Sequence, residues 1–181
     1  MNPHDELQSL IDLFPDGRSL IGRWEHIPAT LTPEPYKSML AHDKHMTVTV
    51  EAYHKTSVDV RVLDRRLVGD DYVRKIVLLK HGTDEVVLFG LVRFDLTTVS
   101  AAVRDEILSE KTPLGRVLIE HNVLRHIDLG AILRITAGPG LSDLLQMPEH
   151  GQTYGRLATI FCDGQPAIDL LEVSAPLERP Q

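Results

Sequence analysis

Three features that mark large classes of proteins are scarce or missing in this sequence. Its single cysteine, Cys162, excludes an internal disulfide and suits a reducing compartment, and its apolar surroundings favour a buried, unreactive thiol. There is no run of about 18 apolar residues that could span a membrane. The first residues, MNPHDELQ, lack the basic start and apolar middle of a signal peptide. We therefore expect a soluble, cytoplasmic protein with no membrane partner.

Positive charge is also in short supply. The chain has 19 Lys and Arg residues against 26 Asp and Glu, which gives a formal net charge of -7. This charge repels nucleic acids and anionic membranes, so we expect neither as a partner. It also repels anionic metabolites, so a site for one would need a few arginines gathered inside a cleft.

The length and apolar content of the chain bound its domain organisation. With 181 residues, of which 43% are hydrophobic, it is long enough to bury most of its surface in one domain and too short for two full domains. We predict a single domain over residues 1–181.

The most regular pattern lies between residues 71 and 118. Apolar and polar residues alternate over 71–95, and turn-forming residues at 81–84 interrupt them, which predicts an antiparallel hairpin. Arg74 lies inside this hairpin. An arginine in an apolar strand either points to solvent or is buried against a carboxylate, and the second arrangement is how proteins capture planar acids.

The other segments predict an α+β fold. Helices are expected at 5–14, 35–41, 97–110 and 141–147. Strands are expected in three hairpins, which are 47–54 with 58–68, the two arms of 71–95, and 154–161 with 166–173. Residues 118–135 predict a helix or irregular cover followed by a strand, and 18–35 give no assignment. The predicted architecture is a mostly antiparallel sheet built from hairpins, with helices packed on it.

Several short motifs occur in an order that resembles one known family. They are the strand with Arg74, then Leu-Phe-Gly-Leu-Val at 88–92, Thr-Pro-Leu-Gly-Arg at 112–116, Tyr-Gly-Arg at 154–156 and Gly-Gln-Pro at 164–166. His-Met-Thr at 45–47 extends the match, which runs from about Met39 to Pro176. This order resembles the chorismate lyase family, which makes 4-hydroxybenzoate and pyruvate from chorismate. The resemblance implies the chorismate lyase-like fold and no cofactor.

The resemblance also implies how the ring carboxylate of the substrate is held. Arg74 suits this task, because its planar fork offers paired hydrogen bonds. In the family, backbone at the positions of Met46 and Leu114 lies beside the acid. Gly115 follows Pro113 and Leu114, and glycine permits the close backbone that a ligand-facing turn needs. Without the flanking matches, Met46 and Leu114 would be ordinary core residues.

Two residues of the last hairpin complete the implied site. Glu172 falls where the family carries an acid, which would donate a proton or hydrogen bond as the leaving group departs. Glu172 comes eight residues after Gly164, whereas one branch of the family has seven, so Asp169 on the opposite face is the fallback. Arg156 is a candidate partner for the enolpyruvyl carboxylate, and a cross-strand ion pair is its alternative role.

Two other functions stay open at the level of sequence. The same fold resembles the effector-binding domains of bacterial transcription regulators, although fewer than about 50 residues precede the match and no basic recognition helix is present. A lyase acting on a different hydroxylated or enolpyruvyl acid is the other. We expect no metal site, since His42 and His45 have no Cys, Asp or Glu at metal-binding spacing. Oligomeric state is left undetermined.

Overall fold

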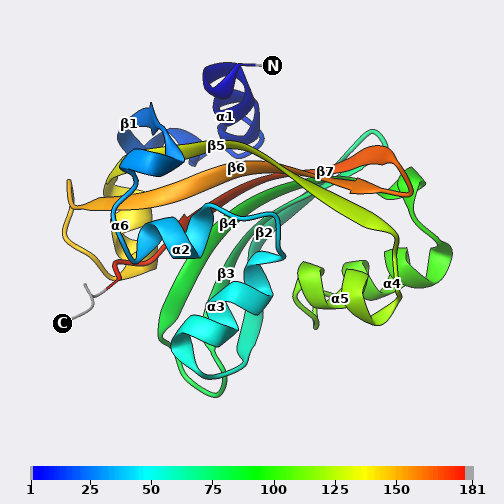
Figure 1. The fold of residues 1–181 in the computed structure, drawn as a ribbon. Helices are drawn as coiled ribbons and strands as arrows, with labels where there is room; N and C mark the ends of the chain where they lie inside the picture. The colour runs from blue at the N-terminus through cyan, green and yellow to red at the C-terminus, as the bar shows by residue number, and fades with distance from the viewer. Residues whose placement is uncertain (1, 178–181) are drawn as a thin grey trace.

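A computed structural model describes residues 2–177 of the chain. Their main feature is one seven-stranded sheet in the order β1-β5-β6-β7-β4-β3-β2, with every neighbouring pair antiparallel (Figure 1). The strands are β1 (Ile21–Ile27), β2 (Val58–Val68), β3 (Asp71–Lys80), β4 (Val86–Asp95), β5 (Arg125–Ala137), β6 (Gln152–Cys162) and β7 (Gln165–Ser174). The predicted α+β fold with a mostly antiparallel sheet is therefore confirmed.

Helices pack on both faces of this sheet. They are α1 (Pro3–Ile11), α2 (Tyr36–Leu40), α3 (Met46–His54), α4 (Ala101–Ser109), α5 (Leu114–Glu120) and α6 (Pro139–Leu145), with short 3-10 helices at Gly17–Ser19, Ala29–Leu31 and Leu96–Thr98. Within residues 2–177, none of the helices is long and apolar enough to cross a membrane.

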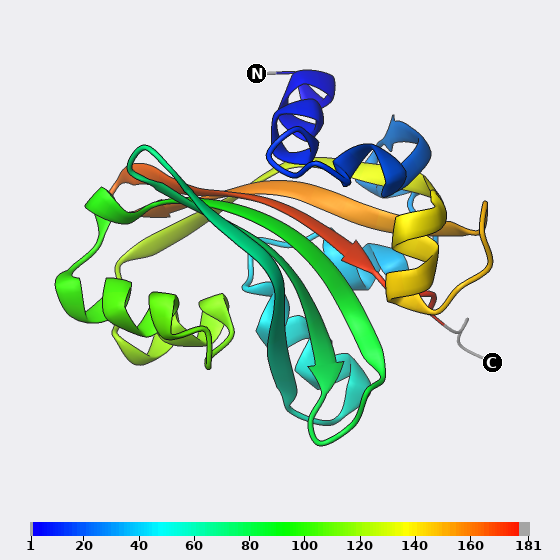
Figure 2. The same cartoon turned by 180° about the vertical axis from the view of Figure 1, so that it is seen from behind.

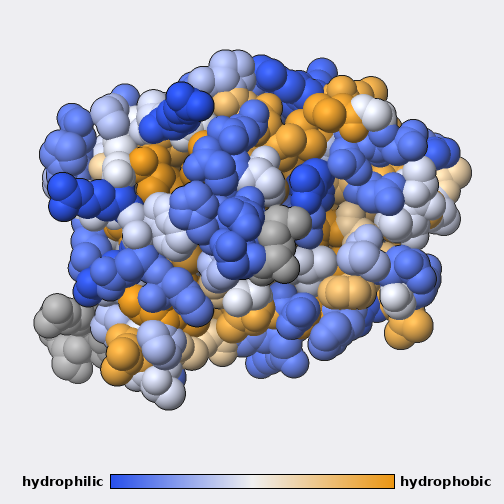
Figure 3. Space-filling view, turned by 90° about the horizontal axis from the view of Figure 1, so that it is seen from above, coloured by the Kyte–Doolittle hydropathy of each residue, from blue (hydrophilic) through white to orange (hydrophobic). Residues whose placement is uncertain are grey.

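The face covered by α1 and α6, which we call the outer face, is closed by apolar packing. Leu7, Leu10 and Ile11 recur at helical spacing on α1 and are buried in one cluster with strand residues such as Val77 and Leu171. Asn2 caps α1 by accepting a hydrogen bond from the Asp5 backbone N–H at 3.0 Å. Seen from the side of α1, the molecule presents mostly hydrophilic residues with apolar patches between them (Figure 3).

The opposite face, which we call the inner face, carries α2 to α5 and has two separate apolar clusters. One surrounds α2 and α3, with Leu40 and Val50 packed on Ile76 and Leu88. The other surrounds α4 and α5 and includes strand residues such as Phe94. Figures 1 and 2 show α3 and α5 side by side beneath the curved sheet. The gap between the two clusters is where the pocket described below lies.

One predicted hairpin is wrong. Residues 47–54 belong to helix α3, and β2 pairs with β3 along its length instead. The β-branched residues at 47–50 favour a strand locally, but burying Met46, Thr47 and Val50 on one side of a helix outweighs that propensity. Strand β1 lies in a segment that received no assignment, while the other two hairpins and the helices near 5–14, 35–41 and 97–110 are confirmed.

Candidate functional site

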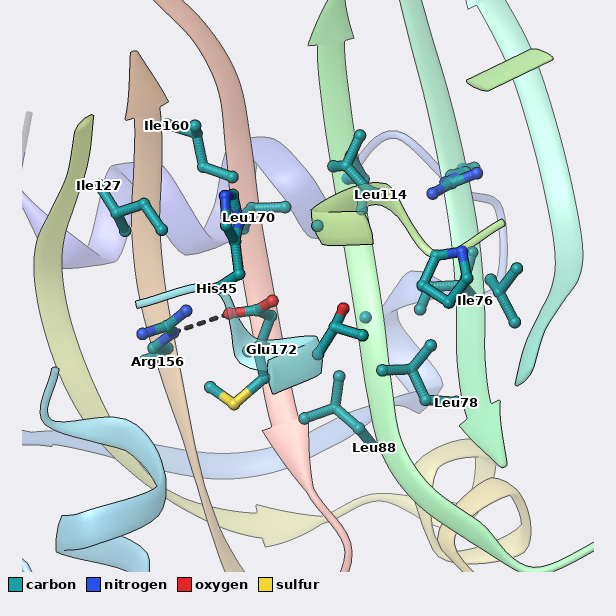
Figure 4. A pocket seen from close by; sticks show the side chains of 18 residues that line it. His45, Ile76, Leu78, Leu88, Leu114, Ile127, Arg156, Ile160, Leu170 and Glu172 are labelled. Carbon is teal, nitrogen blue, oxygen red and sulfur yellow. Dashed lines mark hydrogen bonds and ion pairs between the residues drawn. The ribbon is translucent and has the colours of Figure 1, made fainter. Parts of the chain in front are cut away.

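A narrow pocket lies on the inner face, between the middle of the sheet and the first residues of α3 and α5 (Figure 4). Its unfilled space is about 530 Å³ with the open mouth included. Apolar side chains form most of its lining, including Ile76, Leu78, Leu88, Ile127, Ile160 and Leu170. A flat, mostly apolar molecule suits such a space.

The strand register explains how the polar residues reach this pocket. On four adjacent strands, Arg74 lies opposite Val92, Gly90 opposite Glu172, and Glu172 opposite Arg156. β4 separates the strands of Arg74 and Glu172, so at ~4.8 Å per strand spacing their backbones are roughly 10 Å apart across the sheet. Gly90 lies between them and lines the pocket without a side chain of its own. The glycine therefore leaves room between the two charged residues.

Arg74 is a buried cation with an unused donor. Its side chain is 2% exposed, and its Nη1 has no hydrogen-bond partner within residues 2–177. Burial lowers the pKa of Arg74, and nearby Tyr72 and Glu110 offset part of this effect. A buried donor without a partner is costly, so the unpartnered Nη1 of this guanidinium indicates a site for an anionic ligand.

The starts of α3 and α5 form the wall beside Arg74. Met46 and Leu114 are the first residues of these helices, and the first N–H groups of a helix have no acceptor within it. Gly115 holds the two helix starts together, because a Cβ there would lie 3.1 Å from both His45 Cβ and Thr47 Oγ1. The turn predicted at 113–115 thus begins α5, and its glycine is needed for close packing on α3.

Glu172 and Arg156 form the opposite end of the pocket. Arg156 is fully buried and donates from Nε to Glu172 at 2.7 Å (Figure 4). Its Nη1 donates to the His42 carbonyl at 2.9 Å, and its Nη2 donates to the Lys44 carbonyl at 3.2 Å. The cross-strand pair expected as the alternative role of Arg156 is therefore present. Arg156 also fastens residues 42–44 to the sheet.

His45 lies at the edge of the pocket and is held neutral. Burial lowers its pKa to about 4, with smaller effects from Arg125 and Arg156. The His45 Nε2 accepts a hydrogen bond from Arg125 Nε at 2.5 Å, which leaves Nδ1 as the protonated nitrogen of the neutral ring. Its ring lines both the pocket and a second hollow outside it.

All six residues proposed from the sequence line this one pocket. They are Met46, Arg74, Leu114, Gly115, Arg156 and Glu172. Their roles remain predictions. Sequence reasoning missed Gly90, Thr47 and His45 as lining residues, although a glycine inside a strand pattern is a known sign of close approach by a ligand or backbone.

Other charged and nucleophilic residues lie away from the pocket. Asp169, the fallback acid, lines a hollow next to α1 and accepts hydrogen bonds from Arg93 Nη2 at 2.5 Å and Thr159 at 3.0 Å. Cys162 is buried, and burial raises its pKa to about 11. In the described part of the chain, no group of three His, Cys, Asp or Glu side chains is placed to hold a metal ion.

Comparison with known proteins gives matches only among solved structures. No protein family model and no curated protein sequence matches the chain. The effector domain of PhnF from Mycobacterium smegmatis matches with a TM-score of 0.52 at 10% identity, covering 73% of this chain and 88% of that one. The ligand-binding domain of a protein assigned to the GntR family of transcriptional regulators, from Bordetella bronchiseptica, matches with a TM-score of 0.51 at 14% identity, covering 65% and 85%. These likenesses confirm the chorismate lyase-like fold predicted from the sequence.

Proposed function

We propose that the pocket binds a small cyclic carboxylic acid whose carboxylate pairs with Arg74. The observation that carries this proposal is the buried guanidinium with an unpartnered Nη1 at one end of a narrow apolar space. A carboxylate would accept the free N–H groups, and the apolar walls would cover a flat ring. Because the chain as a whole is acidic, an anion has to be attracted by local cations such as Arg74.

We further propose that the acid is chorismate and that it is cleaved in the pocket to 4-hydroxybenzoate and pyruvate. The bond between the ring carbon and the ether oxygen breaks, and its electron pair leaves with the enolpyruvyl oxygen. The neighbouring ring carbon loses a proton, the ring becomes aromatic, and the released enolate takes up a proton at its methylene carbon to give pyruvate. No oxidant or cofactor is consumed, so the site chiefly has to position the substrate.

Glu172 is the residue we assign to the proton step. It lies two strands from Arg74 and accepts a hydrogen bond from Arg156. A carboxylate held in this way can accept a proton or a further hydrogen bond from the substrate. In this proposal it accepts the ring proton or the hydrogen bond of the ring hydroxyl, in place of the donor role expected from the sequence. Arg156 then acts as a positioning residue that orients Glu172.

Incubation of the purified protein with chorismate, followed by chromatography of the products, tests this function. Formation of 4-hydroxybenzoate and pyruvate in equal amounts is the expected result. Glu172→Gln should slow turnover while 4-hydroxybenzoate still binds, whereas Asp169→Asn, on the outer face of the same strand, should turn over normally. Normal turnover in Glu172→Gln would remove this residue from the proton step.

The second candidate is a protein that binds a small acid without reacting it. The solved structures of the same fold support this option, because they are an effector domain and a ligand-binding domain. Calorimetry with 4-hydroxybenzoate and with chorismate separates the candidates. Binding of unchanged chorismate favours the sensor, and absence of binding to both acids contradicts the proposed ligand class.

A further inference from the structure

Outside His45, the pocket borders a larger open groove. With its open mouth included, the unfilled space of this groove is about 1180 Å³, compared with about 530 Å³ for the pocket. His45 and Ile127 line both spaces, so the His45 ring stands at their boundary. If a ring fills the narrow pocket, a substituent on it would extend past His45 into the groove.

The groove carries cationic groups that the protein itself leaves free. Arg125 donates from Nε to His45 and from Nη1 to the Val123 carbonyl at 3.0 Å, but within residues 2–177 its Nη2 has no hydrogen-bond partner. The ammonium group of Lys44 also makes no hydrogen bond or ion pair there, and Lys44 is exposed. Asp43 is the single acidic residue of the lining. The groove therefore favours an anion, in contrast to the chain as a whole.

Arg156, the cation first considered for a second carboxylate, is already occupied. Each of its three nitrogen atoms donates to a protein oxygen, at Glu172, His42 and Lys44. A ligand carboxylate would have to displace one of these bonds. Arg125, in contrast, lines the groove and has an Nη2 without a hydrogen-bond partner in the described part of the chain.

We propose that this groove is a second anion-binding subsite, in which Arg125 and Lys44 hold the carboxylate of a short side chain attached to the ring bound by Arg74. This inference rests on the proposed binding of a cyclic acid by Arg74. For an enolpyruvyl substrate the groove holds the three-carbon acid, and after cleavage it is the first space that the released keto acid enters. His45 is the positioning residue at the boundary, with its ring orientation fixed by Arg125.

Comparison of a one-carboxylate ligand with a two-carboxylate ligand tests the proposal. The probes are 4-hydroxybenzoate, measured by calorimetry, and chorismate, measured by calorimetry or as KM if it turns over. In Arg125→Gln combined with Lys44→Gln, chorismate affinity should fall about tenfold or more, while that of 4-hydroxybenzoate stays unchanged. Arg74→Ala should weaken both. Arg134→Gln, which removes a cation elsewhere on the same strand, is the matched control and should weaken neither.

The possible failures can be told apart. If the unaltered protein binds neither acid, the proposed function fails and the groove proposal fails with it. If both acids bind and the double variant weakens both equally or neither, only the groove proposal is overturned. Since Arg125→Gln also frees the His45 ring, Lys44→Gln is measured alone. A selective loss of chorismate affinity in that variant supports the subsite. Unchanged affinity for both probes, or an equal loss for both, overturns it.

Discussion

The two ends of the pocket hold two buried arginines with opposite surroundings. Arg74 is 2% exposed and its Nη1 has no partner among residues 2–177, whereas Arg156 is fully buried and every nitrogen of its guanidinium donates to a protein oxygen. Burial alone therefore does not identify a ligand-binding residue. The free hydrogen-bonding capacity of Arg74 marks it as the ligand-binding arginine, and the saturated donors of Arg156 mark it as part of the framework.

The largest predicted effect is on the stability of the folded protein, and it tests whether Arg156 is a framework residue. Replacement of Arg156 in Arg156→Met would leave the Glu172 carboxylate and the carbonyls of His42 and Lys44 without their donor. Breaking a buried pair from one side costs about 3–5 kcal/mol, so the free energy of unfolding measured in urea should fall by that amount. Arg74→Met is the matched control. A loss below about 1 kcal/mol in Arg156→Met would show that Arg156 is not a framework residue.

The second prediction concerns ligand affinity at the other end. Arg74→Met should weaken binding of 4-hydroxybenzoate roughly 30- to 100-fold, which corresponds to a loss of about 2–3 kcal/mol from charged hydrogen bonds. The free energy of unfolding should stay equal or rise, because the substitution removes a buried guanidinium whose Nη1 has no partner within residues 2–177. Calorimetry and urea unfolding measure the two quantities. Affinity at the level of the unaltered protein would place the ligand away from Arg74.

A smaller effect should appear in the pH dependence of stability. The pKa of His45 in the folded protein is about 4, below the ordinary value of 6.5, so the unfolded chain takes up a proton first as pH falls. The stability from neutral His45 is complete above pH 6.5 and is lost as pH falls towards 4. At ~1.4 kcal/mol per tenfold difference in proton affinity, the loss between pH 7 and pH 5 is on the order of 2 kcal/mol. In His45→Asn the free energy of unfolding should fall less between pH 7 and pH 5 than in the unaltered protein. The same pH dependence in both proteins would contradict the prediction.

How much of the site could be read from the sequence depended on where its residues lie. The convergence of Arg74 and Glu172 on one site was predicted from the resemblance to a known family, because alternation fixes which side chains of a hairpin share a face but not which hairpins lie side by side. The strand predicted at 47–54 is wrong because the β-branched residues there favour a strand, while burial on the sheet makes the segment a helix. Contacts that join distant segments, such as Gly115 against His45 or Arg156 with the Lys44 carbonyl, have no local signal.

The smallest expected effect comes from Asp169, which shares strand β7 with Glu172 but lies on the outer face. Its carboxylate pairs with Arg93, and both side chains are 30% exposed, so the pair should contribute less than about 1 kcal/mol. Asp169→Asn should therefore change the free energy of unfolding only slightly and leave the affinity for 4-hydroxybenzoate unaltered. Urea unfolding and calorimetry check both. Because a shift of one residue in β7 would exchange the faces of Asp169 and Glu172, lost affinity in Asp169→Asn would mean that the register of this strand differs from the one described.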